Sequence, residues 1–411
     1  MSTRQRLYPA SGKTTILARH CTDARYVWNL GLEQRNLYRP NRTLRVTANS
    51  QMRELAEARR AFAWFAEGSS SIQQQALRDL DQAFKNWWKK PGHFGRPTWR
   101  RAGQHEGFRV VEIKTRRVNR KWGEVLVPKL GWVRFRLTRP WADVASCRSA
   151  RVTLNHAGQW HVTFASAQPS FLRSTTTAVV GLDLGVAASI ATSDGALLHM
   201  PTLLSAGEAQ RKRRLERQRA RQVVGSKRRA VTKHKIANLC ERESARRKDW
   251  IEKKTTEFVR DFDLLAIEDL KVKNMVRSAK GTNAQPGTNV RQKAGLNRVV
   301  HTQSWATVRT RLEQKAGAAT SPVDVVVVPA RNTSRQCEKC GSTAKENRES
   351  QAVFHCRACG YHAHADVNAA KNILAAGLAV SGRGGTPQSE AIDQSASSGP
   401  VKRQPLVGVA T

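Results

Sequence analysis

Acidic residues, cysteines and long apolar runs are all scarce in this sequence. Asp and Glu number 32 against 71 Lys and Arg, which gives a formal net charge of +39. No uninterrupted apolar run approaches the roughly 20 residues that a membrane-spanning helix needs. The start Met1–Arg6 leads into no apolar core, so we expect no signal peptide. These absences predict a soluble, cytoplasmic protein with no membrane partner.

The seven cysteines argue against a disulfide framework and for a metal site. Two Cys-x-x-Cys pairs are separated by fifteen residues, and Gly341 and Gly360 follow the pairs, as the tight turns of zinc knuckles often need. Four thiolates leave no open position for water, so the Zn²⁺ would be structural. Chance pairing and disulfides are the alternatives. The predicted zinc ligands are Cys337, Cys340, Cys356 and Cys359.

The basic surplus is concentrated in one stretch. Arg211–Lys254 contains 18 Lys and Arg but only 5 Asp and Glu, counted along the sequence. Such a density attracts phosphate and makes binding strongly salt-dependent. A solvated helix face is one alternative. Membrane-surface binding is another, although the stretch has few large apolar residues to insert. A nucleic-acid partner is the favoured interpretation.

Three carboxylates terminate or follow hydrophobic segments. Asp183 ends the run Ala178–Leu182, Glu268 ends Leu264–Ile267, and Asp366 comes just after the cysteines. Taken singly, they have plainer interpretations: a strand-to-turn exit, a surface turn and a helix N-cap. As a set they could hold two Mg²⁺ ions about 3.5–4 Å apart, which activate a water and stabilise a leaving oxygen. The set therefore predicts a nuclease.

Apolar periodicity predicts mixed α and β structure. Alternation from 108 to 165 indicates a small β-barrel, and helical spacing precedes it. The Gly-, Ser- and Pro-rich end after about 380 indicates disorder. The predicted strands cover 4–8, 108–111, 132–137, 159–164, 179–183, 189–192, 263–268 and 323–329. The predicted helices cover 14–36, 47–90 with a break near 68–71, the long basic region, 303–316 and 366–376. A loop is predicted at 280–296.

The stretch Ala83–Pro91 mixes aromatic and basic residues, a combination that can stack bases and hold phosphates. Trp87 and Trp88 would point in different directions on a helix, so at least one of them is expected in a core. The pattern leaves open whether the other contacts nucleic acid.

Several short motifs, taken in order, resemble the TnpB family encoded by insertion-sequence elements, which is related to compact type V CRISPR effectors. The likeness begins near the N-terminus and is strongest around the acids and cysteines. The motifs are Arg6–Pro9, Trp28–Leu32, Leu130–Val133, Gly181–Gly185, Ile267–Leu270, Asn332–Cys337, Cys359–Tyr361 and Asp366–Ala370.

The resemblance implies an RNase H-like (RuvC) nuclease domain with an inserted four-cysteine zinc ribbon, preceded by a small β-barrel that a helical lobe interrupts. The catalytic acids would fall on Asp183, Glu268 and Asp366 and hold two Mg²⁺ ions. The implied domains are the barrel (1–12 and 106–172), the helical recognition lobe (13–105), the nuclease (178–335 and 361–378), the zinc ribbon (336–360), which would help handle target DNA, and a disordered tail (379–411).

The resemblance also implies a function. The protein would be a bacterial, nucleoid-associated monomer carrying a guide RNA derived from the transposon end. It would cleave double-stranded target DNA matched to that RNA beside a short flanking motif. Two alternatives remain open: an RNA-guided repressor that binds without cleaving, and a transposase that performs strand transfer directly.

Overall fold

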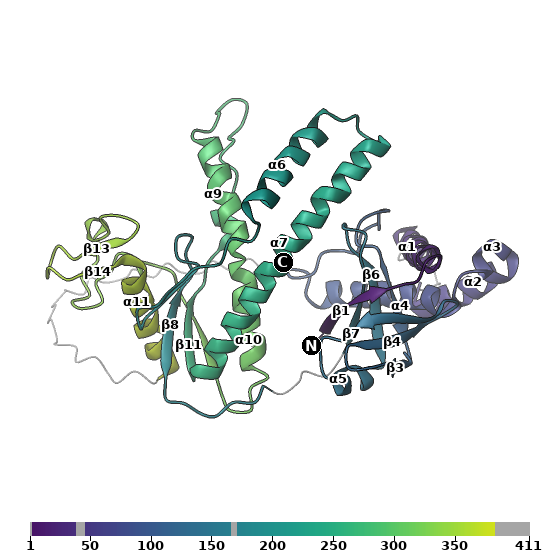
Figure 1. Ribbon diagram of the computed structural model, residues 1–411, viewed down its shortest axis with the longest axis horizontal. Helices are drawn as coiled ribbons and strands as arrows, with labels where there is room; N and C mark the ends of the chain where they lie inside the picture. The colour runs from purple at the N-terminus through teal and green to yellow at the C-terminus, as the bar shows by residue number, and fades with distance from the viewer. Residues whose placement is uncertain (1, 38–45, 166–170, 383–411) are drawn as a thin grey trace, which may run out of the picture. The chain divides into compact units, whose positions relative to one another are not determined.

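The structure is a computed structural model that describes residues 2–37, 46–165 and 171–382 (Figure 1). The described residues divide into two compact units: those within Met1–Ala178, His199–Asp263 and Ser278–Asp324 form the first, and those within Val179–Leu198, Leu264–Arg277 and Val325–Thr411 form the second. Within the described ranges, no helix is long and apolar enough to cross a membrane. Most of the tail predicted to be disordered, from 383 onward, lies outside the described residues.

An antiparallel sheet of seven strands forms the β part of the first unit. Its order is β2-β6-β7-β1-β5-β4-β3, and β1 pairs with both β5 and β7. Inward side chains such as Phe135, Phe164 and Val162 are fully buried, as alternation predicted. The predicted strands are confirmed, while the closed barrel stays a prediction. The strands are β1 (Ser2–Tyr8), β2 (Gly107–Val111), β3 (Thr115–Arg117), β4 (Trp122–Val127), β5 (Gly131–Arg136), β6 (Ser149–Leu154) and β7 (Trp160–Ala165), with the short helix α5 (Trp141–Ala145) between β5 and β6.

Between β1 and β2, the residues that the structure describes form four helices: α1 (Lys13–Leu37), α2 (Ala48–Ala61), α3 (Ala63–Ala66) and α4 (Ser70–Lys89). Helices α1 and α4 pack closely, and Gly31 permits this, since a Cβ there would lie 2.7 Å from the side chain of Leu77. The predicted break near 68–71 is confirmed. A second interruption at Phe62 was not predicted.

The interruption at Phe62 is stabilised by the side chain of Arg59. Phe62 adopts an extended backbone, and the Arg59 guanidinium donates hydrogen bonds to the carbonyls of Phe65, Ala66 and Gly68. These bonds satisfy carbonyls that a continuous helix would have paired internally.

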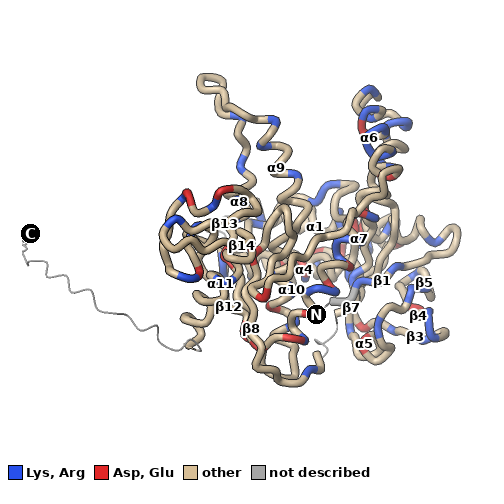
Figure 2. The backbone as a smooth tube through the Cα atoms, turned by 60° about the vertical axis from the view of Figure 1, so that its left-hand side comes forward, with Lys and Arg blue, Asp and Glu red and all other residues tan. Residues whose placement is uncertain are grey.

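The basic stretch forms a helical hairpin of α6 (Ala206–Arg221) and α7 (Lys227–Asp261). A capping box between Ser205 and Glu208 starts α6, and Ser226 caps α7. Figure 2 shows Lys and Arg clustered on α6. Glu208 pairs with Arg242 and Arg246 of α7, so part of the charge joins the two helices.

Two further helices, α9 (Val290–Gln303) and α10 (Trp305–Ala316), follow the hairpin, and α10 packs against α7. The predicted loop at 280–296 is therefore wrong from residue 290 onward. Ser304, with a left-handed φ of 55°, separates the two helices. The prediction took the Gly, Asn and Gln residues of this segment as signs of a loop. Gly295 nevertheless lies within α9, on a side of the helix where a Cβ would have no other atom within 4 Å.

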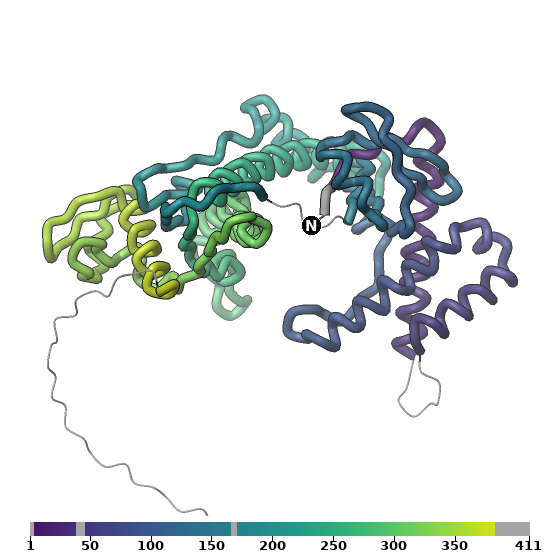
Figure 3. The backbone as a smooth tube through the Cα atoms, turned by 90° about the horizontal axis from the view of Figure 1, so that it is seen from below, coloured from purple at the N-terminus to yellow at the C-terminus, as the bar shows by residue number. Residues whose placement is uncertain are grey.

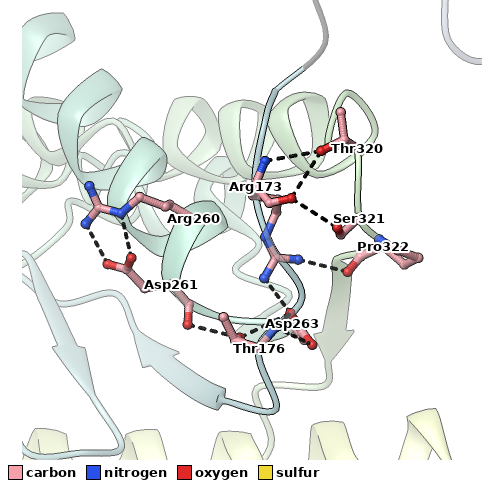
Figure 4. Close-up of polar contacts among 8 residues, drawn as sticks. All are labelled: Arg173, Thr176, Arg260, Asp261, Asp263, Thr320, Ser321 and Pro322. Carbon is pink, nitrogen blue, oxygen red and sulfur yellow. Dashed lines mark hydrogen bonds and ion pairs between the residues drawn. The ribbon is translucent and has the colours of Figure 1, made fainter.

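A polar clasp ties the segment 173–176 to residues 261–263 and 320–322 (Figure 4). The Arg173 side chain is fully buried; it pairs with Asp263 and donates to the Pro322 carbonyl at 3.0 Å. The Thr176 backbone N–H also donates to Asp263, at 3.0 Å. The carbonyl of Arg173 accepts bonds from the Thr320 and Ser321 hydroxyls. Burial raises the pKa of Asp263, but the hydrogen bonds that its carboxylate accepts from Thr176 and Arg173 outweigh this effect and hold the pKa below its usual value.

The second unit contains a five-stranded sheet in the order β10-β9-β8-β11-β12. Strands β9 and β10 pair antiparallel, as do β8 and β9, whereas β8 and β11 are parallel. All five residues of β11 are buried, as expected for a central strand. The strands are β8 (Val179–Asp183), β9 (Ile190–Thr192), β10 (Leu197–Leu198), β11 (Leu264–Glu268) and β12 (Asp324–Val328), and the short helix α8 (Val272–Met275) follows β11.

Helix α11 (Ala365–Ser381) covers β8 and β11, and Figure 3 shows it in yellow beside these strands. Two glycines allow the close approach. A Cβ on Gly181 would lie 2.1 Å from the Ala370 carbonyl, and one on Gly377 would lie 2.5 Å from the Ala266 side chain. The helix extends beyond the predicted end at 376, because Gly377 and Leu378 still pack on the sheet.

Candidate active site and metal centre

Strand pairing brings two of the predicted acids to one end of the five-stranded sheet, and the third lies on the helix that packs on those strands. Asp183 is the last residue of β8 and Glu268 the last residue of β11. The parallel register places Leu182 opposite Ile267, so the two carboxylates leave adjacent strands at the same edge. Asp366 lies in the first turn of α11, which packs on both strands.

The other two acids act electrostatically on Asp183. Burial, followed by the negative charges of Glu268 and Asp366, raises the pKa of Asp183 to about 7. Burial also raises the pKa of Glu268. A carboxylate in such negative surroundings is suited to a hard cation, which would bind the carboxylate oxygens and offset their charge.

Two polar partners hold the acids, and sequence reasoning missed both. The Thr333 hydroxyl donates to Glu268, and the Arg348 guanidinium contacts Asp366 at 2.8 Å. Thr333 belongs to the quoted motif around Asn332–Cys337, which was the available signal. Arg348 lies between the two cysteine pairs, where no local pattern distinguishes it from the neighbouring charged residues.

The four predicted zinc ligands come together in space. Their sulfur atoms all lie within 4.8 Å of one another, and Cys337–Cys359 and Cys340–Cys356 have Sγ–Sγ distances of 3.7 and 3.5 Å. These separations match a tetrahedral site with Zn–S bonds of about 2.3 Å. Gly341 and Gly360 adopt φ of 74° and 72°, and their N–H groups donate to the carbonyls of Cys337 and Cys356. The cluster could hold a zinc ion.

A two-stranded hairpin completes this cysteine module, which we define as residues 337–364. It contains the 3₁₀ turn η1 (Lys345–Asn347), β13 (Val353–His355) and β14 (His362–His364). Asn347 is fully buried and donates to the carbonyls of Arg335 and Ser342, so it pins the loop between the two pairs. Neither of these two strands was predicted.

Two asparagines of α11 tie the cysteine module to the acids. Asn368 accepts a bond from the Glu338 N–H and donates to the Gln336 carbonyl. Asn372 donates to the carbonyls of Gln336 and Thr333. Thr333 in turn donates to Glu268. One chain of hydrogen bonds therefore links the cysteine module, the helix that carries Asp366 and the strand that carries Glu268.

Comparison with known proteins identifies the class first. The chain shares the fold of the protein in the cryo-EM structure of a Cas12f1–sgRNA–target DNA complex, with a TM-score of 0.54 over 89% of this chain and 83% of that one, at 13% identity. A domain described as "Cas12f1-like, TNB domain" matches residues 305–373, which include all four cysteines. A second, described as "Probable transposase", matches residues 167–279. The fold is thus that of the compact Cas12f1-like proteins.

Sequence relatives then identify the family. The chain is 38% identical over 329 residues, 79% of each protein, to "Putative RNA-guided DNA endonuclease InsQ" of Escherichia coli (strain K12). It is 29% identical over 407 residues to "Putative RNA-guided DNA endonuclease" of Streptomyces pristinaespiralis, covering 98% of this chain and 95% of the relative. The chain belongs to the TnpB family, as its motifs predicted.

Proposed function

We propose that this protein is the RNA-guided DNA endonuclease of an insertion-sequence element. It cleaves double-stranded DNA that matches a guide RNA derived from the transposon end, beside a short flanking motif. The observation that carries the proposal is the convergence of Asp183, Glu268 and Asp366 at one sheet edge, in a family whose relatives bear that name.

The topology supports an RNase H-like (RuvC) assignment for the nuclease. Antiparallel β10, β9 and β8 are followed by β11, parallel to β8, with a helix across the sheet. The three acids lie at the ends of two adjacent parallel strands and at the start of this helix. The proposed nuclease domain covers residues 178–335 and 361–378, and the proposed zinc ribbon covers residues 336–360.

Asp183, Glu268 and Asp366 would hold two Mg²⁺ ions, which when bound would activate a water and stabilise the leaving oxygen of the phosphodiester. The remaining roles belong to the protein. Thr333 fixes the orientation of Glu268 through its hydroxyl, and Arg348 neutralises Asp366 and supplies positive charge beside the site. The cysteine module positions Arg348, so zinc would act structurally.

The proposed partners are a guide RNA and double-stranded DNA, bound by one copy of the chain. The net charge of +39 and the basic hairpin α6–α7 support a polyanionic partner. The predicted barrel (1–12 and 106–172) and helical lobe (13–105) would hold the RNA and the heteroduplex.

The test uses protein purified with the RNA that it retains. That RNA is sequenced, and a matched plasmid with a randomised flank is supplied with Mg²⁺. We expect cutting that depends on the match and the flank, and a loss of at least about 1,000-fold for Asp183→Ala. Asp249→Ala, which removes an exposed acid of α7, is the matched control and should cut normally.

Two other results would replace the proposal. Matched binding without cutting would indicate an RNA-guided repressor, and joined rather than cut products would indicate a strand-transferring transposase. Cutting that survives Asp183→Ala would refute the site assignment.

A further inference from the structure

The tryptophan pair at the end of α4 separates into one core residue and one exposed residue. Trp87 is partly buried and packs with Trp28, Leu32 and Phe84. Trp88 is 61% exposed, and its ring lies 5.5 Å from that of Phe84. The exposed ring offers a face on which a planar ligand can stack.

Trp88 borders a cavity within the helical lobe. The cavity has a volume of about 580 Å³, inside the range of about 300–1,000 Å³ typical of ligand sites. Its apolar surface comes from Val46, Ala48, Phe84 and Trp88, and its polar lining comes from Arg35, Thr47, Asn49, Asp81 and Lys85. The walls come from α1, the start of α2 and α4, all within the first unit.

A buried ion pair makes the floor of the cavity rigid. The Arg35 guanidinium is 6% exposed; it contacts Asp81 at 2.8 Å and lies 5.0 Å from the Phe84 ring centre. Its Nε also donates to Gln51 at 3.1 Å. Lys85 contacts the other oxygen of Asp81 at 2.8 Å but remains 57% exposed, so its ammonium faces both the cavity and solvent. A floor fixed in this way loses little conformational freedom when a ligand binds.

We propose that this cavity binds a single unpaired nucleotide, with the base stacked on Trp88 and the phosphate facing Lys85. The combination of an exposed indole, a solvent-facing ammonium and a side-chain amide fits this ligand, because every base has a π-face and every nucleotide carries a negative charge. The lining holds two cations, Arg35 and Lys85, against the one carboxylate of Asp81, and an apolar peptide would not balance the remaining positive charge. The net charge of +39 favours a polyanion further.

The inference rests on the nucleic-acid partner of the proposed function but not on cleavage. Its test is therefore made without Mg²⁺ and without a target, using the full chain freed of RNA. Failure of this test would leave the endonuclease proposal standing, and a protein that does not cut could still show the stacking.

The experiment measures binding of fluorescent ten-residue single strands by anisotropy, with RNA and DNA arms to identify the source of the nucleotide. Trp88→Ala should weaken binding by about 5- to 100-fold for the strand type that is the ligand. Trp88→Phe should retain most of the affinity, because it keeps a ring. Trp64→Ala is the matched control, since Trp64 is 55% exposed on α3 and outside this cavity.

A fully abasic strand of the same length separates stacking from charge. Trp88→Ala should leave its affinity unchanged, because there is no base to stack. An equal loss on intact and abasic strands, an equal loss from Trp64→Ala, or no loss on either RNA or DNA would overturn the proposal. Thermal melting followed by circular dichroism checks that each variant is folded, as expected for an exposed side chain.

Discussion

Asp183 couples the ionisation of the acid cluster to the stability of the fold. Its pKa is about 7, well above the value of about 3.9 for an aspartic acid in an unfolded chain. A carboxyl with a raised folded pKa contributes stability that is fully present below the unfolded pKa and is lost as the pH rises through the folded pKa. The cluster should therefore strain the metal-free protein most at and above neutral pH.

We predict that the metal-free protein loses part of its stability between about pH 4 and pH 7 through Asp183, with no further loss above. The measurement is the urea midpoint of the wild type minus that of Asp183→Asn at each pH, so that other titrating groups cancel. Adding Mg²⁺ should abolish the decline, because a bound cation offsets the repulsion. A flat difference curve without metal would contradict the prediction.

The cysteine module has too small an apolar core to be stable by itself, so we expect it to depend on a bound metal ion. Its buried apolar cluster contains only Cys337, Phe354, Cys356 and Ala365, with Tyr361 against it. Structural zinc can supply roughly 10–16 kcal/mol to such a module. If the module unfolded, Arg348 would no longer contact Asp366, and Asn368 and Asn372 would lose their hydrogen bonds to residues 336–338.

Cys340→Ser should therefore release the zinc and unfold residues 337–364 while the two larger sheets persist. Metal content and hydrogen exchange of the module measure the two effects. Cys240→Ser, which changes an exposed cysteine of α7 outside the cluster, should keep both the zinc and the protection. Retention of a full zinc by the Cys340 variant would show that the four-thiolate site is wrongly assigned.

The clasp around Arg173 predicts an unequal response from two neighbouring arginines (Figure 4). Arg173→Ala leaves Asp263 without its main cation and should lower the free energy of unfolding by about 3 kcal/mol. Arg260→Ala removes an ion pair with Asp261 that is open to solvent and should change little. Urea titrations followed by circular dichroism compare the two, and equal midpoints would contradict the assignment.

Over the whole molecule, the charge of +39 is divided between cations that hold the fold and cations that face solvent. On the α6–α7 hairpin, Arg242 and Arg246 contact Glu208, and Lys212 contacts Glu243. Arg213, Arg214 and Arg217 lie on α6 and line one basic hollow of its surface. These three arginines are available to phosphates.

Replacing Arg213, Arg214 and Arg217 by Gln should weaken nucleic-acid binding and flatten its salt dependence. For every phosphate that the variant no longer neutralises, the slope of log K against log salt should fall by about 0.7–0.9. The control is Lys253→Gln, since Lys253 pairs with Asp249 on α7. Titrations at several salt concentrations measure both slopes, and an unchanged slope in the triple variant would place the binding surface elsewhere.

Local patterns predicted most of the strands and helices, since alternation and helical spacing act over a few residues. They failed where the determining contacts are distant. The loop expected at 280–296 contains the start of α9, and α2 ends early at Phe62, where Arg59 binds the following carbonyls. The domain limits and the catalytic roles stay predictions.

The four-cysteine spacing, the basic surplus, the order of the three acids and the family can all be recognised in the amino-acid sequence. The folded structure is needed to see that Asp183 and Glu268 end adjacent parallel strands, that Arg348 and Thr333 hold two of the acids, and that Trp88 rather than Trp87 is exposed. These contacts depend on strand order and helix docking. Both are set by packing between segments far apart in the chain, which no short run of residues encodes.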